Sequence, residues 1–109
     1  PIGSPILFFF HIGTATLTDS SQLANIDEIA RICKKYDLLL KVTGYADSAT
    51  GNSADNSVLS NQRANYIVSE LKKREISERA IKLYSEGGVD TYTPNKVNRC
   101  AIIEIHLKH

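Results

Sequence analysis

Apolar runs alternate with mixed, more polar stretches along this chain, and four of the runs have the length of strands. Ile6 to Phe10 is apolar and aromatic, which predicts a buried strand. The apolar run 38–45 predicts a second strand, and the run 101–107 predicts a strong last strand. A shorter apolar pattern at 81–84 predicts one further, short strand.

Two other stretches carry apolar residues at the three- and four-residue spacing of an amphipathic helix. The first spans 20–36, with Asp19 as its N-cap and Gln22 completing a capping box. The second spans 57–74. The two apolar faces consist of Leu23, Ile26, Ile29, Ala30 and Cys33 in the first helix and of Leu59, Ala64, Ile67, Val68 and Leu71 in the second.

The predicted order of elements is β-α-β-α-β-β, with polar, turn-rich segments at 46–57 and 87–98. Two amphipathic helices can cover one face of a four-stranded sheet. The pattern therefore predicts an α+β two-layer sandwich, with both helices packed on one face of a mixed sheet. The 109 residues contain no repeat and no linker, so we expect a single domain over 1–109. Because the chain opens almost directly on an apolar strand, we expect a domain excised from a longer secreted or anchored protein.

Charge and hydropathy argue against several kinds of partner. The chain has 13 basic and 12 acidic residues and a formal net charge of +1, whereas nucleic-acid binding usually needs a strong basic excess. The run Ile6 to Phe10 is far too short to span a bilayer. Cys33 and Cys100 are too few for a disulfide framework. Buried thiols are the simpler expectation for them, and a single bridge stays open.

The polar segment before the second helix has one acid and one base at its two ends. Asp47 follows the second strand, where loops often carry ligand contacts. Arg63 borders the core-facing stripe and lies within about two turns of the predicted helix start, where free N–H groups attract anions. Facing one cleft, Asp47 suits an ammonium and Arg63 a carboxylate, so the pair suits a zwitterion. The alternative, in which Asp47 and Arg63 pair with each other, stays open.

The sequence shows no recognisable catalytic or metal-binding set. It has no G-x-S-x-G nucleophile elbow. A raised pKa at Asp47 or Asp55 would need an apolar pocket, which this polar segment is not expected to form. His11, His106 and His109 are scattered, and the 47–55 loop lacks the spaced acids and closing Glu of a calcium loop. We expect no metal and no cofactor.

A family resemblance rests on two motifs and extends over nearly the whole chain. GYAD at 44–47 and an N-x-x-LS-x-x-RA pattern at 56–64 resemble the signature of the OmpA-like peptidoglycan-binding domain. The same domain occurs in the peptidoglycan-associated lipoprotein and in flagellar stator proteins. The Phe-rich opening strand and Asn98-Arg99 before the last strand are similar to the family's first and last motifs.

The resemblance implies a two-layer fold and non-catalytic binding of the peptidoglycan stem peptide at diaminopimelate. The side chain of that residue ends in an amine and a carboxylate on one carbon. The binding residues that the resemblance implies are Asp47, Arg63, Asn56, His11, Ile12 and Arg99. Asn56 would hydrogen-bond the stem peptide or brace the loop. His11 stands where the family often has an acid, and Cys100 stands where its late motif has a second arginine.

The leading hypothesis is a module that tethers an outer-membrane protein to the cell wall, on the periplasmic side of a Gram-negative envelope. The domain itself would not be inserted in a membrane, and pairing with a second copy stays open. One alternative is a peptidoglycan hydrolase or amidase, whose catalytic set is not visible. Another is a protein–protein assembly domain, which would not bind the cell wall at all.

Overall fold

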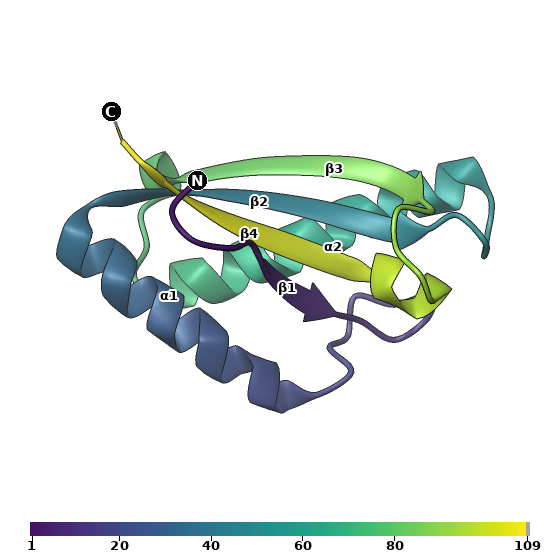
Figure 1. Ribbon diagram of the computed structural model, residues 1–109, viewed down its shortest axis with the longest axis horizontal. Coiled ribbons are helices and arrows are strands. Elements are labelled where there is room, and N and C mark those ends of the chain that lie inside the picture. The colour runs from purple at the N-terminus through teal and green to yellow at the C-terminus, as the bar shows by residue number, and fades with distance from the viewer. Residues whose placement is uncertain (109) are drawn as a thin grey trace.

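Figure 1 shows the computed structural model of the protein, which describes residues 1–108. The strands are β1 (Ile6–Phe9), β2 (Leu38–Asp47), β3 (Ile81–Val89) and β4 (Cys100–Leu107), and the helices are α1 (Leu23–Tyr36) and α2 (Ser53–Lys73). Short 3-10 turns lie at η1 (Ser20–Gln22), η2 (Glu78–Ala80) and η3 (Asn95–Asn98). Strands and α-helices follow in the predicted order β-α-β-α-β-β. Neither α1 nor α2 is long and apolar enough to cross a bilayer.

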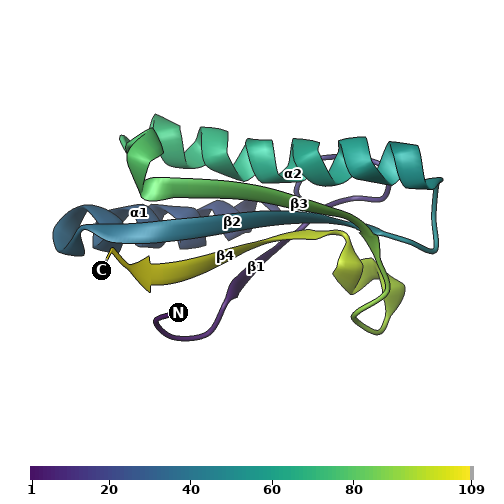
Figure 2. The same ribbon diagram turned by 90° about the horizontal axis from the view of Figure 1, so that it is seen from above.

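The four strands form one mixed sheet in the order β1-β4-β2-β3. β2 and β3 pair in parallel, with α2 as the crossover between them, and β4 runs antiparallel to both β1 and β2. Figure 2 shows α2 extended along the sheet. Both helices share a single core with one face of the strands, and its members include Phe8, Leu40, Val42 and Ile103 from the sheet, Ile26 and Ile29 from α1, and Ile67 and Leu71 from α2. The predicted α+β two-layer sandwich is confirmed.

A glycine in β2 lets α2 lie unusually close to the sheet. A Cβ atom on Gly44 would come within 1.9 Å of the Ser60 main-chain oxygen and 2.9 Å of the Ala64 nitrogen, both in α2. No residue with a side chain fits there unless the helix moves away. This close contact brings the part of α2 that carries Arg63 against the end of β2.

Several predicted boundaries are wrong, including the start of the first helix, which is Leu23 instead of residue 20, and the largest differences lie around one end of the sheet. β2 continues to Asp47, and α2 begins at Ser53 instead of residue 57, because the Asn52 side chain accepts a hydrogen bond of 2.8 Å from Asp55 N. β3 extends to Val89 through a pair of glycines expected in a turn-rich segment. The register with β2 shifts there, and Gly87 N donates to Ser60 Oγ at 3.0 Å.

Gln22 does not complete the predicted capping box. Asp19 does act as a cap, since its carboxylate accepts a hydrogen bond of 2.9 Å from Ser21 N, but the turn that it caps is η1. The Gln22 side chain instead reaches β1, where it accepts from Phe9 N at 2.7 Å and donates to Phe9 O at 3.3 Å. Gln22 therefore ties the start of α1 to the strand that precedes the candidate site.

Candidate functional site

Arg63 lies at the centre of the site and is fully buried, with 0% of its surface exposed. Its Nε donates to Thr14 O at 2.9 Å, Nη1 to Tyr45 O at 2.9 Å, and Nη2 to His11 O at 3.3 Å. The guanidinium carbon also lies 5.5 Å from the centre of the Phe10 ring. Arg63 thus joins α2 to the turn at 11–14 and to the end of β2.

Burial lowers the pKa of Arg63 to about 10, an effect that the negative charge of Asp47 opposes. The guanidinium therefore remains protonated at neutral pH. It has five N–H groups, of which three donate to the main chain. The sequence placed Arg63 near the helix start, and this was wrong. With α2 beginning at Ser53, Arg63 lies beyond the first turn, where the helix dipole acts most strongly.

Asp47 is the last residue of β2 and is only 2% exposed. Its Oδ1 accepts a hydrogen bond of 2.9 Å from Ala49 N, and its Oδ2 accepts one of 3.3 Å from Arg99 Nη2. The salt bridge of Asp47 is therefore with Arg99. Among residues 1–108, no ion pair joins Asp47 to Arg63, so the structure does not show the closed pair that the sequence left open.

Asn56, near the start of α2, braces the loop between β2 and α2. It is 6% exposed, and its Nδ2 donates to Thr50 O at 2.9 Å and to Asp47 O at 3.4 Å. A Cβ atom on Gly88 would lie 2.9 Å from the same nitrogen, so the glycine in β3 makes room for this side chain. Of the two roles left open for Asn56, the structure shows the bracing one.

A depression of about 460 Å³ lies over this loop, and we name it the acidic depression. It is lined by Ile12, Gly13, Thr50, Gly51, Asp55, Asn56, Val58, Leu59 and Gln62. Asp55 is the charged member of this set. Ile12 is 56% exposed, and the neighbouring His11 contributes its main-chain oxygen to Arg63. The acidic depression thus brings Ile12 and Asn56 together. The main-chain oxygen of Asp47 accepts from Asn56 in its lining, and Arg63 bonds to the carbonyl groups of His11 and Thr14, which flank the lining residues Ile12 and Gly13.

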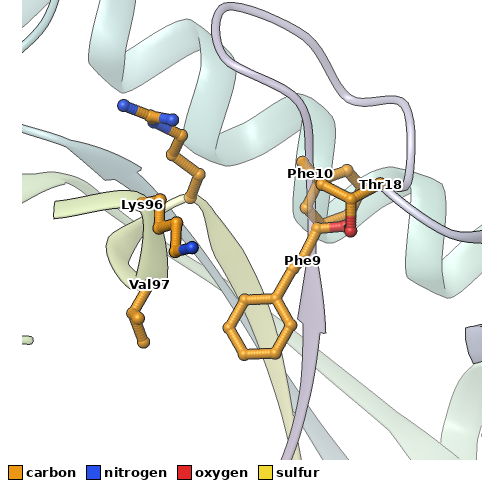
Figure 3. Close-up of a pocket in the computed structure, with 6 residues that line it drawn as sticks. Phe9, Phe10, Thr18, Lys96 and Val97 are labelled. Carbon is orange, nitrogen blue, oxygen red and sulfur yellow. The ribbon is translucent and has the colours of Figure 1, made fainter. Parts of the chain in front are cut away.

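A second depression, of about 380 Å³, contains Arg99 and is named the basic depression. It is lined by Phe9, Phe10, Thr18, Lys96, Val97 and Arg99. Figure 3 shows Lys96 and Val97 on one side of it and Phe9, Phe10 and Thr18 on the other. The sequence singled out Arg99 but missed Lys96. The signal available was the spacing of three residues between these two cations, which matches one turn of a 3-10 helix such as η3.

Residues 1–108 contain no group of three or more His, Cys, Asp or Glu side chains placed to hold a metal ion. Cys33 and Cys100 are both free and buried. Burial raises the pKa of the Cys100 thiol to about 12, which leaves it protonated at neutral pH.

Similarity to known proteins covers most of the chain. The model of the OmpA family matches residues 9–101. Outer membrane protein 40 of Porphyromonas gingivalis is 32% identical over 96 residues, which are 87% of this chain and 25% of that protein. The chain thus spans about a quarter of the length of this curated relative.

Solved structures share the fold at low sequence identity. The peptidoglycan-associated lipoprotein of Burkholderia pseudomallei superposes with a TM-score of 0.81 at 17% identity, covering 92% of this chain and 89% of that one. The OmpA-like domain of FopA1 from Francisella tularensis gives 0.80 at 20% identity, covering 91% and 69%. The C-terminal domain of Helicobacter pylori MotB gives 0.75 at 18% identity, covering 94% and 85%.

Proposed function

Because this chain belongs to the OmpA family, we propose that it binds peptidoglycan without catalysis, holding the diaminopimelate of a stem peptide beside Asp47 and Arg63. The observation that supports this most directly is the meeting of the two charges at one end of the sheet. Arg63, on α2, donates to Tyr45 O, two residues before Asp47 on β2. In this proposal the acid and the base act next to the acidic depression, since Asp47 O accepts from Asn56 and Arg63 donates to the carbonyl groups on either side of Ile12 and Gly13.

The chemistry of the site suits a zwitterion. The ammonium group of diaminopimelate would lie toward Asp47, with Asp55 adding negative charge in the acidic depression. Its carboxylate would take the N–H groups of Arg63 that do not bond to the main chain. Buried, oriented donors favour such an ion pair, because their desolvation is already part of the folded state.

Access to Arg63 requires movement of the turn at 11–14, since the carbonyl groups of His11 and Thr14 cover the guanidinium. The contact of Nη2 with His11 O is the longest of the three, at 3.3 Å, and is the first that a ligand carboxylate would replace. Gly13, at φ +67°, gives this turn a backbone conformation that few other residues adopt. His11 would therefore take part through its main-chain carbonyl group, which does not require an acidic side chain at this position.

The remaining implied residues have supporting roles in this proposal. Asn56 holds the loop that carries Asp47, Ile12 covers the aliphatic part of the ligand, and Arg99 orients the Asp47 carboxylate. We further propose that residues 1–109 form one domain of a longer protein. This domain would tether the longer protein to the cell wall from the periplasmic side of the outer membrane. The name of the curated relative, an outer membrane protein four times as long as the matched segment, supports that placement.

Co-sedimentation with purified sacculi tests the proposal. Wild-type protein is expected to sediment, Asp47→Asn to lose most of the binding, and the exposed-site control Asp90→Asn to behave as wild type. Free meso-diaminopimelate should compete. Circular dichroism establishes that each variant is folded.

Three results would contradict the proposal in different ways. Sedimentation of Asp47→Asn at the wild-type level would show that the ligand binds elsewhere. Release of soluble muropeptides by the wild type would favour a hydrolase or amidase. Failure of the wild type to sediment would favour an assembly domain for protein partners.

A further inference from the structure

The basic depression carries positive charge that no acid of its own lining neutralises. Its charged members are Lys96 and Arg99. Among residues 1–108, no salt bridge involves Lys96, whereas Arg99 bonds to Asp47 from the edge of the depression. The Nε atom of Arg99 is buried and has no hydrogen-bond partner, so this arginine retains donor capacity. An anion is the charge that this surface favours.

Most of the remaining surface of the basic depression is apolar. Phe9 and Val97 are half-buried, Phe10 is buried, and Thr18 adds a hydroxyl group at the rim. Figure 3 shows the amine of Lys96 and the ring of Phe9 facing each other across the open space. A ligand group that fits both features carries a carboxylate directly on a small aliphatic unit, because the aliphatic part can contact the rings while the charge meets Lys96.

The basic and acidic depressions are close neighbours. Phe10 lines the first and Ile12 the second, and only His11 separates them in the chain. Because two residues of fully extended chain cover about 7 Å, the Cα atoms of Phe10 and Ile12 are no farther apart than that. Asp47 connects the depressions a second time, since its side chain bonds to Arg99 at 3.3 Å and its main-chain oxygen to Asn56 at 3.4 Å. One short peptide can therefore contact both.

We propose that the basic depression is a second subsite for the stem peptide and takes the terminal D-alanine that follows diaminopimelate. The inference rests on the proposed function. The carboxylate of D-alanine pairs with Lys96, and its methyl group packs against Phe9 and Val97. A stem peptide that ends in this free carboxylate then binds more tightly than one in which the same group is amidated or linked to another stem.

The test crosses two ligands with two proteins. The ligands are the soluble tetrapeptide L-Ala-γ-D-Glu-meso-diaminopimelate-D-Ala and the same peptide with a C-terminal amide. The proteins are the wild type and Lys96→Gln, and affinity is measured by calorimetry. The wild type is expected to bind the free acid about threefold to tenfold more tightly than the amide. Lys96→Gln should bind both peptides with the affinity that the wild type shows for the amide.

Two control proteins distinguish failure of the subsite from failure of the proposed function. Lys82→Gln removes another exposed lysine, on β3, and should keep the full preference for the free acid. Asp47→Asn should lower the affinity for both peptides by a similar factor. Equal affinity of the wild type for acid and amide, or an unchanged preference in Lys96→Gln, would overturn the subsite while binding itself stands. If neither peptide binds the wild type, the proposed function and the subsite both fail.

Discussion

The turn at 11–14 helps to line the acidic depression, and the residues just before it, Phe9 and Phe10, line the basic one, yet the charges of the two depressions relate differently to the fold. Asp55 lies in the first turn of α2, where a carboxylate stabilises the positive end of the helix dipole. Lys96 lies in the 3-10 turn η3 and makes no ion pair within residues 1–108. The acid therefore has a structural role whether or not a ligand is present, whereas the lysine has none that the contacts reveal. Because of this difference, we propose that Lys96 binds the carboxylate of the terminal D-alanine, which Asp47 and Arg63 do not contact in the proposed complex.

Beneath both depressions, Asp47 and Arg63 also differ from each other. Arg63 satisfies three main-chain carbonyl groups from two separate segments, so its side chain is part of the folded core. Asp47 bonds to one main-chain nitrogen and to the partly exposed Arg99. Substitution of the arginine should therefore affect stability and binding together, while a conservative change of the acid should mainly affect binding.

Gly44→Ala should have the largest effect, because the core depends on the contact between α2 and β2. The added methyl group would overlap main-chain atoms of Ser60 and Ala64, and a main chain cannot move aside as a side chain can. We expect a loss of about 4 kcal/mol or more in the free energy of unfolding, measured by urea denaturation.

Gly13→Ala is the matched control for that substitution. Gly13 has a positive φ, of +67°, which Gly44 does not have, and no atom lies within 4 Å of a Cβ built on it. Backbone strain alone should cost about 1 kcal/mol. Equal losses in the two variants would show that the close contact at Gly44 is not what holds the helix in place.

Arg63→Ala should have the next largest effect. It leaves the carbonyl groups of His11, Thr14 and Tyr45 without their donor, and the turn between the two depressions loses its attachment to α2. A loss of about 3 kcal/mol in the free energy of unfolding is expected. Arg31→Ala is the control, because its ion pair with Glu28 is exposed and should contribute nothing measurable. A stable Arg63→Ala variant would show that water replaces the guanidinium without cost.

Reversing one charge in each depression tests the comparison itself. Asp55→Lys places a cation at the start of α2 and should lower the free energy of unfolding by about 0.5–1 kcal/mol. Lys96→Glu should leave stability unchanged, because the lysine makes no ion pair in the described chain. Thermal unfolding of the two variants side by side measures the difference. If Lys96→Glu is the more destabilised protein, its charge has a structural role that the contacts do not reveal.

Salt should produce the smallest change and act unequally on the two parts of the site. The preference for the free acid over the amide depends on the exposed Lys96 and should shrink toward equality at about 0.5 M salt. Binding of the amide depends on the buried Asp47 and Arg63 and should change less. Calorimetry of both peptides at low and high salt measures the two trends. A salt-insensitive preference would contradict the assignment of that preference to the charge of Lys96.

The order of elements and the fold class followed from the periodicity of the chain, because burial of one helix face and of the strands requires it. The boundaries that were wrong, at Asp47, Ser53 and Gly87-Gly88, lie where polar residues continue regular structure. In these polar segments the pattern of apolar residues does not indicate where a strand or helix begins or ends. Hydrogen bonds that the side chains of Asn52 and Ser60 accept, from Asp55 N and from Gly87 N, decide where these elements start and end.

By itself the sequence determined the two-layer architecture, through the spacing of its apolar residues, and the family, through the resemblance of its motifs to a known signature. It also singled out Asp47 and Arg63 as candidate binding residues. Only the tertiary structure decided the partners of Asp47 and Arg63, and the place of Lys96 beside Phe9. The physical reason is that a buried charge takes its partners from whichever segments the fold brings within hydrogen-bonding distance. For Arg63 those segments lie as many as 52 residues away in the chain.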